Sequence, residues 1–155
     1  MNTDVMFSSK SDEWETPQDL FDKLNKEFGF TLDPCATHQN HKCSKYYTIE
    51  DDGLSKSWKN EKVFVNPPYG RSIGKWVKKC YHEATHATVV ILMPARTDTS
   101  YFHDYIYTEA DEIRFLRGRL KFTNRALPSN SDSGKHKVSP APFPSMIVVY
   151  YNRRW

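Results

Sequence analysis

The stretch VFVNPPYG, residues 63–70, decides the fold class. Its first three residues are β-branched or aromatic, a composition typical of a buried strand. Two consecutive prolines follow, and a proline has no N–H to donate to a neighbouring strand. The strand is therefore predicted to end at Val65, so that the segment from Asn66 to Tyr69 lies directly beyond its carboxyl end.

Strands alternate with helices on both sides of this stretch. The helices are predicted over residues 16–28, 73–86 and 100–107, and the strands over residues 30–33, 46–49, 63–65, 88–93, 112–116, 119–122 and 146–151. The continuous apolar run TVVILM at 88–93 is typical of a central parallel strand. This alternation predicts an α/β fold with an open, mostly parallel sheet and helices on both faces.

The composition is that of a soluble globular protein. The 155 residues are 38% hydrophobic and 26% charged, with a formal net charge of +3, which permits a polyanionic partner without requiring one. No apolar run is long enough to span a membrane and no signal peptide is evident, so we expect a cytoplasmic protein. Three cysteines make a disulfide framework improbable on number alone, and reduced thiols are expected.

Two segments are expected to lie outside the regular structure. Residues 1–12 are polar and are predicted to form a flexible N-terminus. Residues 123–142 are rich in Ser, Asn, Gly, Pro and Lys, and a loop of about 20 residues is uncommon in a small domain unless it is functional or disordered. We therefore expect one domain over residues 13–155, with 123–142 as a flexible insert.

Three of the predicted strands end on polar sequence that contains proline. These ends are LDPCA at 32–36, VNPPY at 65–69 and MPAR at 93–96. Each of them alone is compatible with a plain turn. In open α/β sheets, however, ligands bind outside the carboxyl ends of the strands, and three such ends together indicate a site.

The NPPY segment suits a planar amine as the group to be modified. The Asn66 side-chain oxygen and the Pro67 carbonyl can each accept one amino hydrogen, which frees the nitrogen lone pair for attack. Pro67 and Pro68 hold both acceptors in place before the substrate arrives. The Tyr69 ring offers a face on which a base can stack. No general base is needed, because the proton leaves once the nitrogen has become positively charged.

NPPY after a strand resembles the signature of amino-methyltransferases that use S-adenosylmethionine, and the chain as a whole is similar to small phage-type DNA adenine methyltransferases. The similar segments are WETP (14–17), LDPCA (32–36), YYTIEDDGL (46–54), FVNPPY (64–69), LMPARTD (92–98), RGRLKF (117–122) and APFPS (141–145). The resemblance implies a Rossmann-like methyltransferase fold and transfer of a methyl group from S-adenosylmethionine to N6 of a flipped-out adenine in DNA. It assigns the catalytic role to Asn66, Pro67, Pro68 and Tyr69.

The resemblance also implies a cofactor site in the first third of the chain. Thr16 would contact the methionine end of the cofactor or serve only as a helix N-cap, and Trp14 would pack over the cofactor or form a hydrophobic staple. Asp33 would pair with the cofactor ammonium group or cap the following turn. An acidic residue among 50–52 would bind the ribose or the adenine. The resulting cofactor set is Trp14, Thr16, Pro17, Asp33, Pro34, Cys35, Ala36, Asp51 and Asp52, with Glu50 as the remaining candidate.

DNA is the partner that the resemblance implies. Arg96, Arg119 and Lys121 lie near strand ends, where they would hold phosphates or simply form solvated surface. Phe122 or Phe143 would form the wall of the base pocket opposite the tyrosine, or belong to the core. The insert at residues 123–142 would contact DNA. A monomer and a weak dimer remain equally open.

Three alternatives stand beside this interpretation. The run CATHQNHKC at 35–43 contains two cysteines and two histidines, but nine residues carrying all four zinc ligands would be unusually compact, and no metal is predicted. The acceptor could instead be RNA or a protein glutamine. The chain could also be a catalytically silent DNA-binding module, against which the intact NPPY segment argues.

Overall fold

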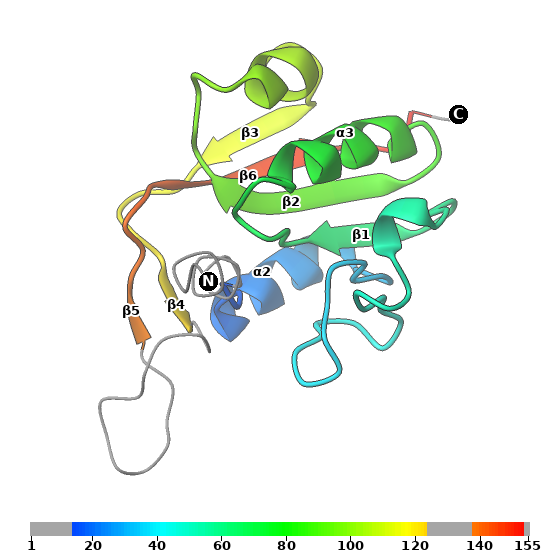
Figure 1. The fold of residues 1–155 in the computed structure, drawn as a ribbon, viewed down its shortest axis with the longest axis horizontal. Helices are drawn as coiled ribbons and strands as arrows, with labels where there is room; N and C mark the ends of the chain where they lie inside the picture. The colour runs from blue at the N-terminus through cyan, green and yellow to red at the C-terminus, as the bar shows by residue number, and fades with distance from the viewer. Residues whose placement is uncertain (1–13, 124–137, 154–155) are drawn as a thin grey trace, which may run out of the picture.

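The computed structural model describes residues 14–123 and 138–153 of the chain. Its centre is a four-stranded sheet in the spatial order β1-β2-β6-β3, beside which a separate pair of strands, β4 and β5, extends away from the sheet (Figure 1). The strands are β1 (Lys62–Val65), β2 (Thr88–Pro94), β3 (Glu112–Phe115), β4 (Lys121–Thr123), β5 (Val138–Pro140) and β6 (Ser145–Tyr150). The helical elements are α2 (Gln18–Phe28), the 3-10 turn η1 (Gly53–Ser55), α3 (Ile73–Glu83) and the π-helical turn η2 (Phe102–Ile106).

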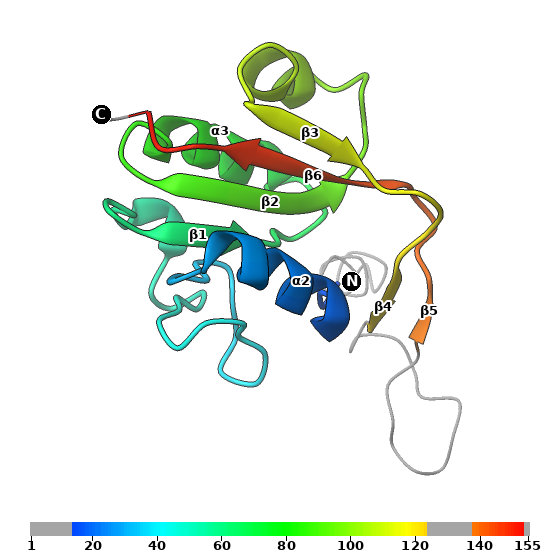
Figure 2. The same ribbon diagram turned by 180° about the vertical axis from the view of Figure 1, so that it is seen from behind.

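Helices cover both faces of the sheet, as predicted (Figures 1 and 2). Side chains alternate between the two faces along a strand, so that Val63 and Val65 pack with α3 and η2 whereas Phe64 packs with α2. The apolar residues of α3 and α2 recur at helical spacing, which places each of the two helices against one face. The protein therefore has two hydrophobic layers separated by a buried sheet.

The direction of the last strand differs from the prediction. β1 and β2 pair in parallel, but β6 lies antiparallel between β2 and β3. The expectation of a mostly parallel sheet is therefore right for the direction of β1, β2 and β3 and wrong for β6. The physical reason is the connection: its described residues form the β4–β5 pair and no crossover helix, and the chain re-enters the sheet at the end where β3 left it.

The carboxyl ends of β1, β2 and β3 consequently lie at one edge of the sheet, together with the start of β6. The Ala95 amide donates to the Pro144 carbonyl at 2.9 Å, and the Leu116 amide donates to the Ser145 carbonyl at 3.0 Å. Two isolated parallel bridges, Leu32 with Val63 and Asp33 with Tyr46, continue the sheet beyond β1. They stand where longer strands were predicted at 30–33 and 46–49, and they bring Asp33 to the same edge.

Several predicted boundaries also need correction. Pro17, not Thr16, is the N-cap residue of α2, and no side chain of the described residues caps this helix. The helix ends at Phe28 as predicted, and Gly29 follows it in a left-handed conformation with φ 66°. The segment predicted as a loop at 123–142 contains β5 at its C-terminal end, where β5 pairs with β4. The rest of that insert, 124–137, and the predicted flexible N-terminus lie outside the described residues. No helix in the described part of the chain is long and apolar enough to cross a membrane.

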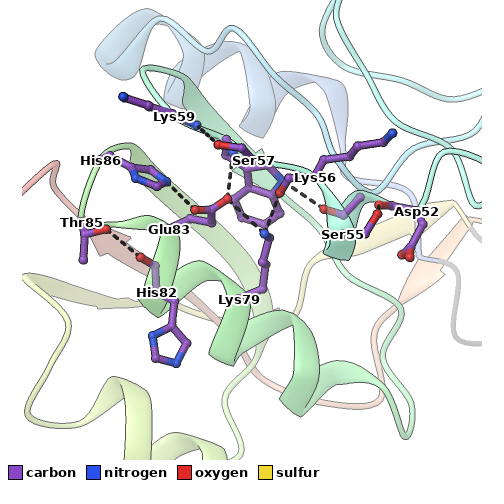
Figure 3. A network of polar contacts seen from close by, with 12 residues as sticks. Asp52, Ser55, Lys56, Ser57, Lys59, Lys79, His82, Glu83, Thr85 and His86 are labelled. Carbon is purple, nitrogen blue, oxygen red and sulfur yellow. Dashed lines mark hydrogen bonds and ion pairs between the residues drawn. The ribbon is translucent and has the colours of Figure 1, made fainter.

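A buried carboxylate ties the segment after η1 to α3 (Figure 3). Oε1 of Glu83 accepts a hydrogen bond from the Trp58 amide at 2.8 Å and forms an ion pair with Lys79 at 3.0 Å. Oε2 of Glu83 contacts the His86 ring. Burial opposes ionisation, but these hydrogen bonds outweigh it and lower the pKa of Glu83 below 4.5. The network holds residues 53–58 against α3, which supports the pocket described below.

Replacing Glu83 with alanine is expected to lower the free energy of unfolding by about 2–3 kcal/mol, because the buried Trp58 amide would lose its acceptor. Urea denaturation measures the change. Since the pKa of Glu83 is lowered by folding, its contribution is complete above pH 4.5 and is lost as the pH falls through the folded pKa. Glu27→Ala is the matched control: its carboxylate is exposed and pairs only with Arg114, and we expect a loss of about 1 kcal/mol or less. Equal losses for the two variants would contradict the prediction.

Candidate active site

A pocket of about 570 Å³ lies at the carboxyl edge of the sheet. Four loop segments form most of its wall: residues 14–16, the loop at 33–42, the acidic turn at 48–54, and residues 66–68. Trp76 of α3 and Ser72, the N-cap residue of this helix, also line the pocket. Two of the three predicted proline-bearing strand ends contribute to the pocket, whereas the MPAR segment (93–96), which ends β2 and continues to Arg96, takes no part in its wall.

Most of the predicted cofactor residues line this pocket, namely Trp14, Thr16, Asp33, Pro34, Cys35, Ala36 and Asp52. Two do not. Pro17 belongs to the start of α2, where its carbonyl accepts a hydrogen bond from the Phe21 amide at 3.1 Å. The Asp51 carboxylate accepts from the amide of Thr48 at 2.9 Å and from its hydroxyl at 3.2 Å, so it caps the acidic turn and does not line the pocket.

The pocket wall also includes residues that the sequence did not single out. Ile49 is 90% exposed yet lies at this wall, and Trp76 contributes from α3. An apolar residue before an acidic turn, or a tryptophan on the apolar face of a helix, is indistinguishable from a core residue by sequence pattern. Glu50, which was predicted less strongly than its two neighbours, lines the pocket beside Asp52.

Asp33 caps the turn that follows it and lies at the pocket, whereas its pairing with a cofactor ammonium group stays a prediction. Its Oδ1 accepts from the Cys35 amide at 3.3 Å and its Oδ2 from the Lys42 amide at 2.9 Å. Burial raises the pKa of Asp33 even though both hydrogen bonds oppose the shift. A carboxylate has more lone pairs than these two bonds occupy, so it can still accept from a cation in the pocket.

Within the described residues, the Asn66 side-chain amide forms hydrogen bonds through its nitrogen and not through its oxygen. Its side-chain nitrogen donates to the Trp14 carbonyl and, at 2.9 Å, to the Thr16 hydroxyl oxygen. Its side-chain oxygen is buried and has no hydrogen-bond partner among the described residues. Buried acceptors normally have partners, so an orphaned oxygen at a pocket wall is the group expected to receive a donor from a substrate. Pro67 and Pro68 line the same wall.

Tyr69 and the two predicted phenylalanines form one aromatic cluster with Trp14. The Tyr69 ring makes edge contacts with Phe122 at 6.1 Å and with Phe143 at 5.5 Å between centroids, and both phenylalanines also contact the Trp14 ring. The Tyr69 hydroxyl donates to the Leu92 carbonyl at 3.1 Å, and burial raises its pKa. Rings in edge contact leave no space for a base between them, so the predicted base pocket is closed in this arrangement.

The predicted DNA contacts lie at the same edge but outside the pocket. Arg96 follows β2, whereas Arg119 and Lys121 lie at the start of β4, and all three are exposed. Within the described residues none of them forms an ion pair. Their charges are therefore available to an anionic partner at this edge.

The two histidines of the 35–43 segment are engaged with neighbouring groups. The His41 ring stacks on Tyr46 with centroids 4.0 Å apart, and its Nδ1 lies 2.9 Å from the Cys43 carbonyl. The Nδ1 of His38 lies 2.9 Å from the Tyr46 hydroxyl. Over residues 14–123 and 138–153, no three ligating side chains are grouped as a metal ion requires. Burial raises the pKa of Cys43 to about 12, which keeps this thiol neutral.

A family model described as DNA N-6-adenine-methyltransferase (Dam) matches residues 4–154. The chain belongs to the DNA N-6-adenine-methyltransferase family. This match, together with the two phage relatives described next, confirms the predicted resemblance to phage-type DNA adenine methyltransferases.

Two relatives within the DNA N-6-adenine-methyltransferase family show how much of the chain is shared. The DNA N-6-adenine-methyltransferase of Escherichia phage T1 is 34% identical over 141 residues, which cover 77% of this chain and 59% of the relative. The protein of the same name from Haemophilus phage HP1 (strain HP1c1) is 27% identical over 146 residues, which cover 92% of this chain and 80% of the relative.

Proposed function

We propose that this protein transfers the methyl group of S-adenosylmethionine to the N6 amino group of adenine in DNA. The observation that carries the proposal concerns the Asn66 side chain: its amide nitrogen donates to two acceptors, and its buried amide oxygen has no hydrogen-bond partner in the described part of the chain. Such an oxygen suits an incoming amino group. The family and the names of its phage relatives support adenine in DNA as the source of that group.

The pocket beside Asn66 is the proposed cofactor site. Asp33 supplies a buried carboxylate for an ammonium group, and Glu50 and Asp52 supply acceptors for ribose hydroxyls. When bound there, S-adenosylmethionine supplies a methyl group activated by a sulfonium. The acidic lining and the absence of a glycine-rich phosphate loop in the sequence suit this ligand better than a dinucleotide.

The residues of the chain then have the following roles in the transfer. Asn66 Oδ1 and the Pro67 carbonyl accept the two amino hydrogens, which localises the lone pair on the adenine nitrogen for in-line attack on the methyl carbon. The two prolines keep these acceptors in place as positive charge develops on the nitrogen. Correct positioning of the adenine nitrogen and the methyl carbon supplies most of the rate acceleration. The surplus proton on the nitrogen passes to water after the methyl group has been transferred.

Adenine must leave the duplex to reach Asn66. We infer that the aromatic cluster opens at that step, so that Tyr69 exposes a ring face to the base and Phe122 or Phe143 forms the opposite wall. Arg96, Arg119 and Lys121 would hold the flanking phosphates. The insert at 123–142, most of which lies outside the described residues, is proposed to contact DNA.

The finer fold assignment belongs to the same proposal. With the two isolated bridges included, the spatial order is Tyr46, Leu32–Asp33, β1, β2, β6 and β3, with only β6 reversed. This order supports a Rossmann-like methyltransferase fold over a single domain at residues 13–155. The phage origin of the relatives supports action on DNA in the cytoplasm of a bacterial host as part of this proposal.

The test is to incubate the protein with radiolabelled S-adenosylmethionine and, separately, unmethylated DNA, RNA and protein. The products are digested and the labelled component is identified. We expect label in N6-methyladenine from DNA, and none when the DNA is already fully methylated at adenine. Label found only in RNA or in glutamine would establish one of the alternative acceptors instead. Cofactor binding without transfer to any acceptor would contradict the proposal.

Replacing Asp33 with asparagine is expected to weaken cofactor binding by about 10- to 100-fold, because a charged hydrogen bond is lost. The pKa of Asp33 is raised above 3.8, so its carboxylate takes up a proton at a higher pH than an ordinary aspartate as the pH falls. Wild-type affinity should therefore decline as the pH falls through the raised pKa of Asp33, and the variant should lack this dependence. Calorimetric titration measures both. Asp19→Asn, on the exposed first turn of α2, should match the wild type, and a wild-type pH dependence in the Asp33 variant would refute the assignment.

A further inference from the structure

Thr16 is a buried residue next to the start of α2, but its hydroxyl does not cap that helix. The residue is only 4% exposed. Its oxygen instead accepts a hydrogen bond from the Asn66 side-chain nitrogen at 2.9 Å, across 50 positions of sequence. The bond therefore joins the segment before α2 to the residue at the end of β1.

This bond acts together with the Trp14 carbonyl on the same nitrogen. A side-chain amide has two N–H groups, and here each of them has an acceptor in the segment before α2. Turning the amide over would place its oxygen against the Trp14 carbonyl, which can only accept, so the observed orientation is the favourable one. With both donors used at one end, the oxygen at the other end is left for the substrate.

We propose that Thr16 is a positioning residue for methyl transfer, whose hydroxyl oxygen fixes the Asn66 amide so that Oδ1 remains ready to accept the adenine amino group. This inference rests on the proposed function and assigns to Thr16 a role distinct from cofactor binding. Without the Thr16 hydroxyl, the Asn66 amide nitrogen keeps only its hydrogen bond to the Trp14 carbonyl, and the side-chain amide can rotate more freely. Asn66 Oδ1 would then point toward the adenine amino group for a smaller fraction of the time.

The consequence should appear in kcat rather than in affinity. The adenine nitrogen gains positive charge during the transfer, so its hydrogens donate more strongly to Asn66 Oδ1 in the transition state than in the bound substrate. An interaction that strengthens in the transition state contributes to kcat. A direct contact between Thr16 and the cofactor would instead contribute to cofactor binding.

The experiment compares Thr16→Val, which keeps the shape and removes the hydroxyl, with Thr16→Ser, which keeps the hydroxyl. We expect Thr16→Val to lower kcat by about 10- to 100-fold while the Kd for S-adenosylmethionine, measured by calorimetry, changes by about twofold or less. Thr16→Ser should restore kcat to within about threefold of the wild type. Thr88→Val is the matched control, since Thr88 loses only a bond to the Asn152 amide far from the site.

A second measurement needs neither cofactor nor DNA. The side-chain amide of Asn66 gives a nitrogen-15 NMR signal that is assigned by its absence in Asn66→Ala. In Thr16→Val this signal should shift and exchange with water faster, whereas Thr88→Val should leave it unmoved. An unmoved signal in Thr16→Val, or a weakened cofactor Kd with wild-type kcat at saturating cofactor, would overturn the inference. Absence of transfer by the wild-type protein is a different result, which would overturn the proposed function.

Discussion

Replacing Asn66 with alanine is expected to lower kcat for methyl transfer to DNA by about 10³-fold, while the Kd for S-adenosylmethionine changes by about threefold or less. Removing one preorganised polar group that stabilises developing charge in an active site has an effect of this size. The Asn66 oxygen is buried and has no partner within residues 14–123 and 138–153, so it is already desolvated before the substrate binds. Initial rates with labelled cofactor and calorimetric titration of the cofactor measure the two quantities.

Two further variants separate chemistry from folding. Asn66→Asp keeps an acceptor near Oδ1 but places an oxygen against the Trp14 carbonyl, so we expect activity between that of the alanine variant and the wild type. Asn25→Ala is the control, because the Asn25 side chain caps only the Phe30 amide at the exposed end of α2 and should leave kcat unchanged. An alanine variant at position 66 that kept more than about a tenth of wild-type kcat would contradict the proposed mechanism.

The residues of the candidate site that could be predicted from sequence are those with a local chemical signature. Two prolines after an apolar strand locate Asn66 at a strand end, and an Asp-Pro after another strand locates Asp33 beside it. Parallel strands then bring both residues to one edge, whatever the rest of the chain does. Helices on both faces follow in the same way from the apolar spacing of α2 and α3.

What could not be predicted depends on contacts between distant segments or on the shape of a turn. The bond between Thr16 and Asn66 joins positions 50 apart, and nothing near Thr16 distinguishes it from an N-cap. Asp51 and Asp52 are adjacent acidic residues, but Asp52 adopts a left-handed conformation with φ 57° and faces the pocket, while Asp51 bonds to the turn. The reversed direction of β6 is set by its connection rather than by its apolar sequence.

The second large effect is expected at Gly53, where the loop at 33–42 and the acidic turn at 48–54 meet in the proposed cofactor pocket. A Cβ added at this position would lie 2.2 Å from the Pro34 carbonyl oxygen and 3.1 Å from the Trp76 ring. Backbone cannot be displaced as easily as the end of a flexible side chain, so Gly53→Ala must move residues 33–36 or the acidic turn. We expect the Kd for S-adenosylmethionine to rise by about 100-fold or more, since Asp33 and Asp52 would no longer face the same ligand.

Gly74 in α3 provides the matched control for the glycine substitution. The nearest atom to an added Cβ there is in the Tyr101 ring, at 3.6 Å, an ordinary van der Waals distance. Gly74→Ala should therefore leave cofactor affinity unchanged and stabilise the protein by up to about 1 kcal/mol, because alanine is the better helix former. Calorimetric titration and urea denaturation of both variants measure the contrast. Wild-type affinity in Gly53→Ala would mean that the two loops can separate without loss, and that the close approach at Pro34 does not shape the pocket.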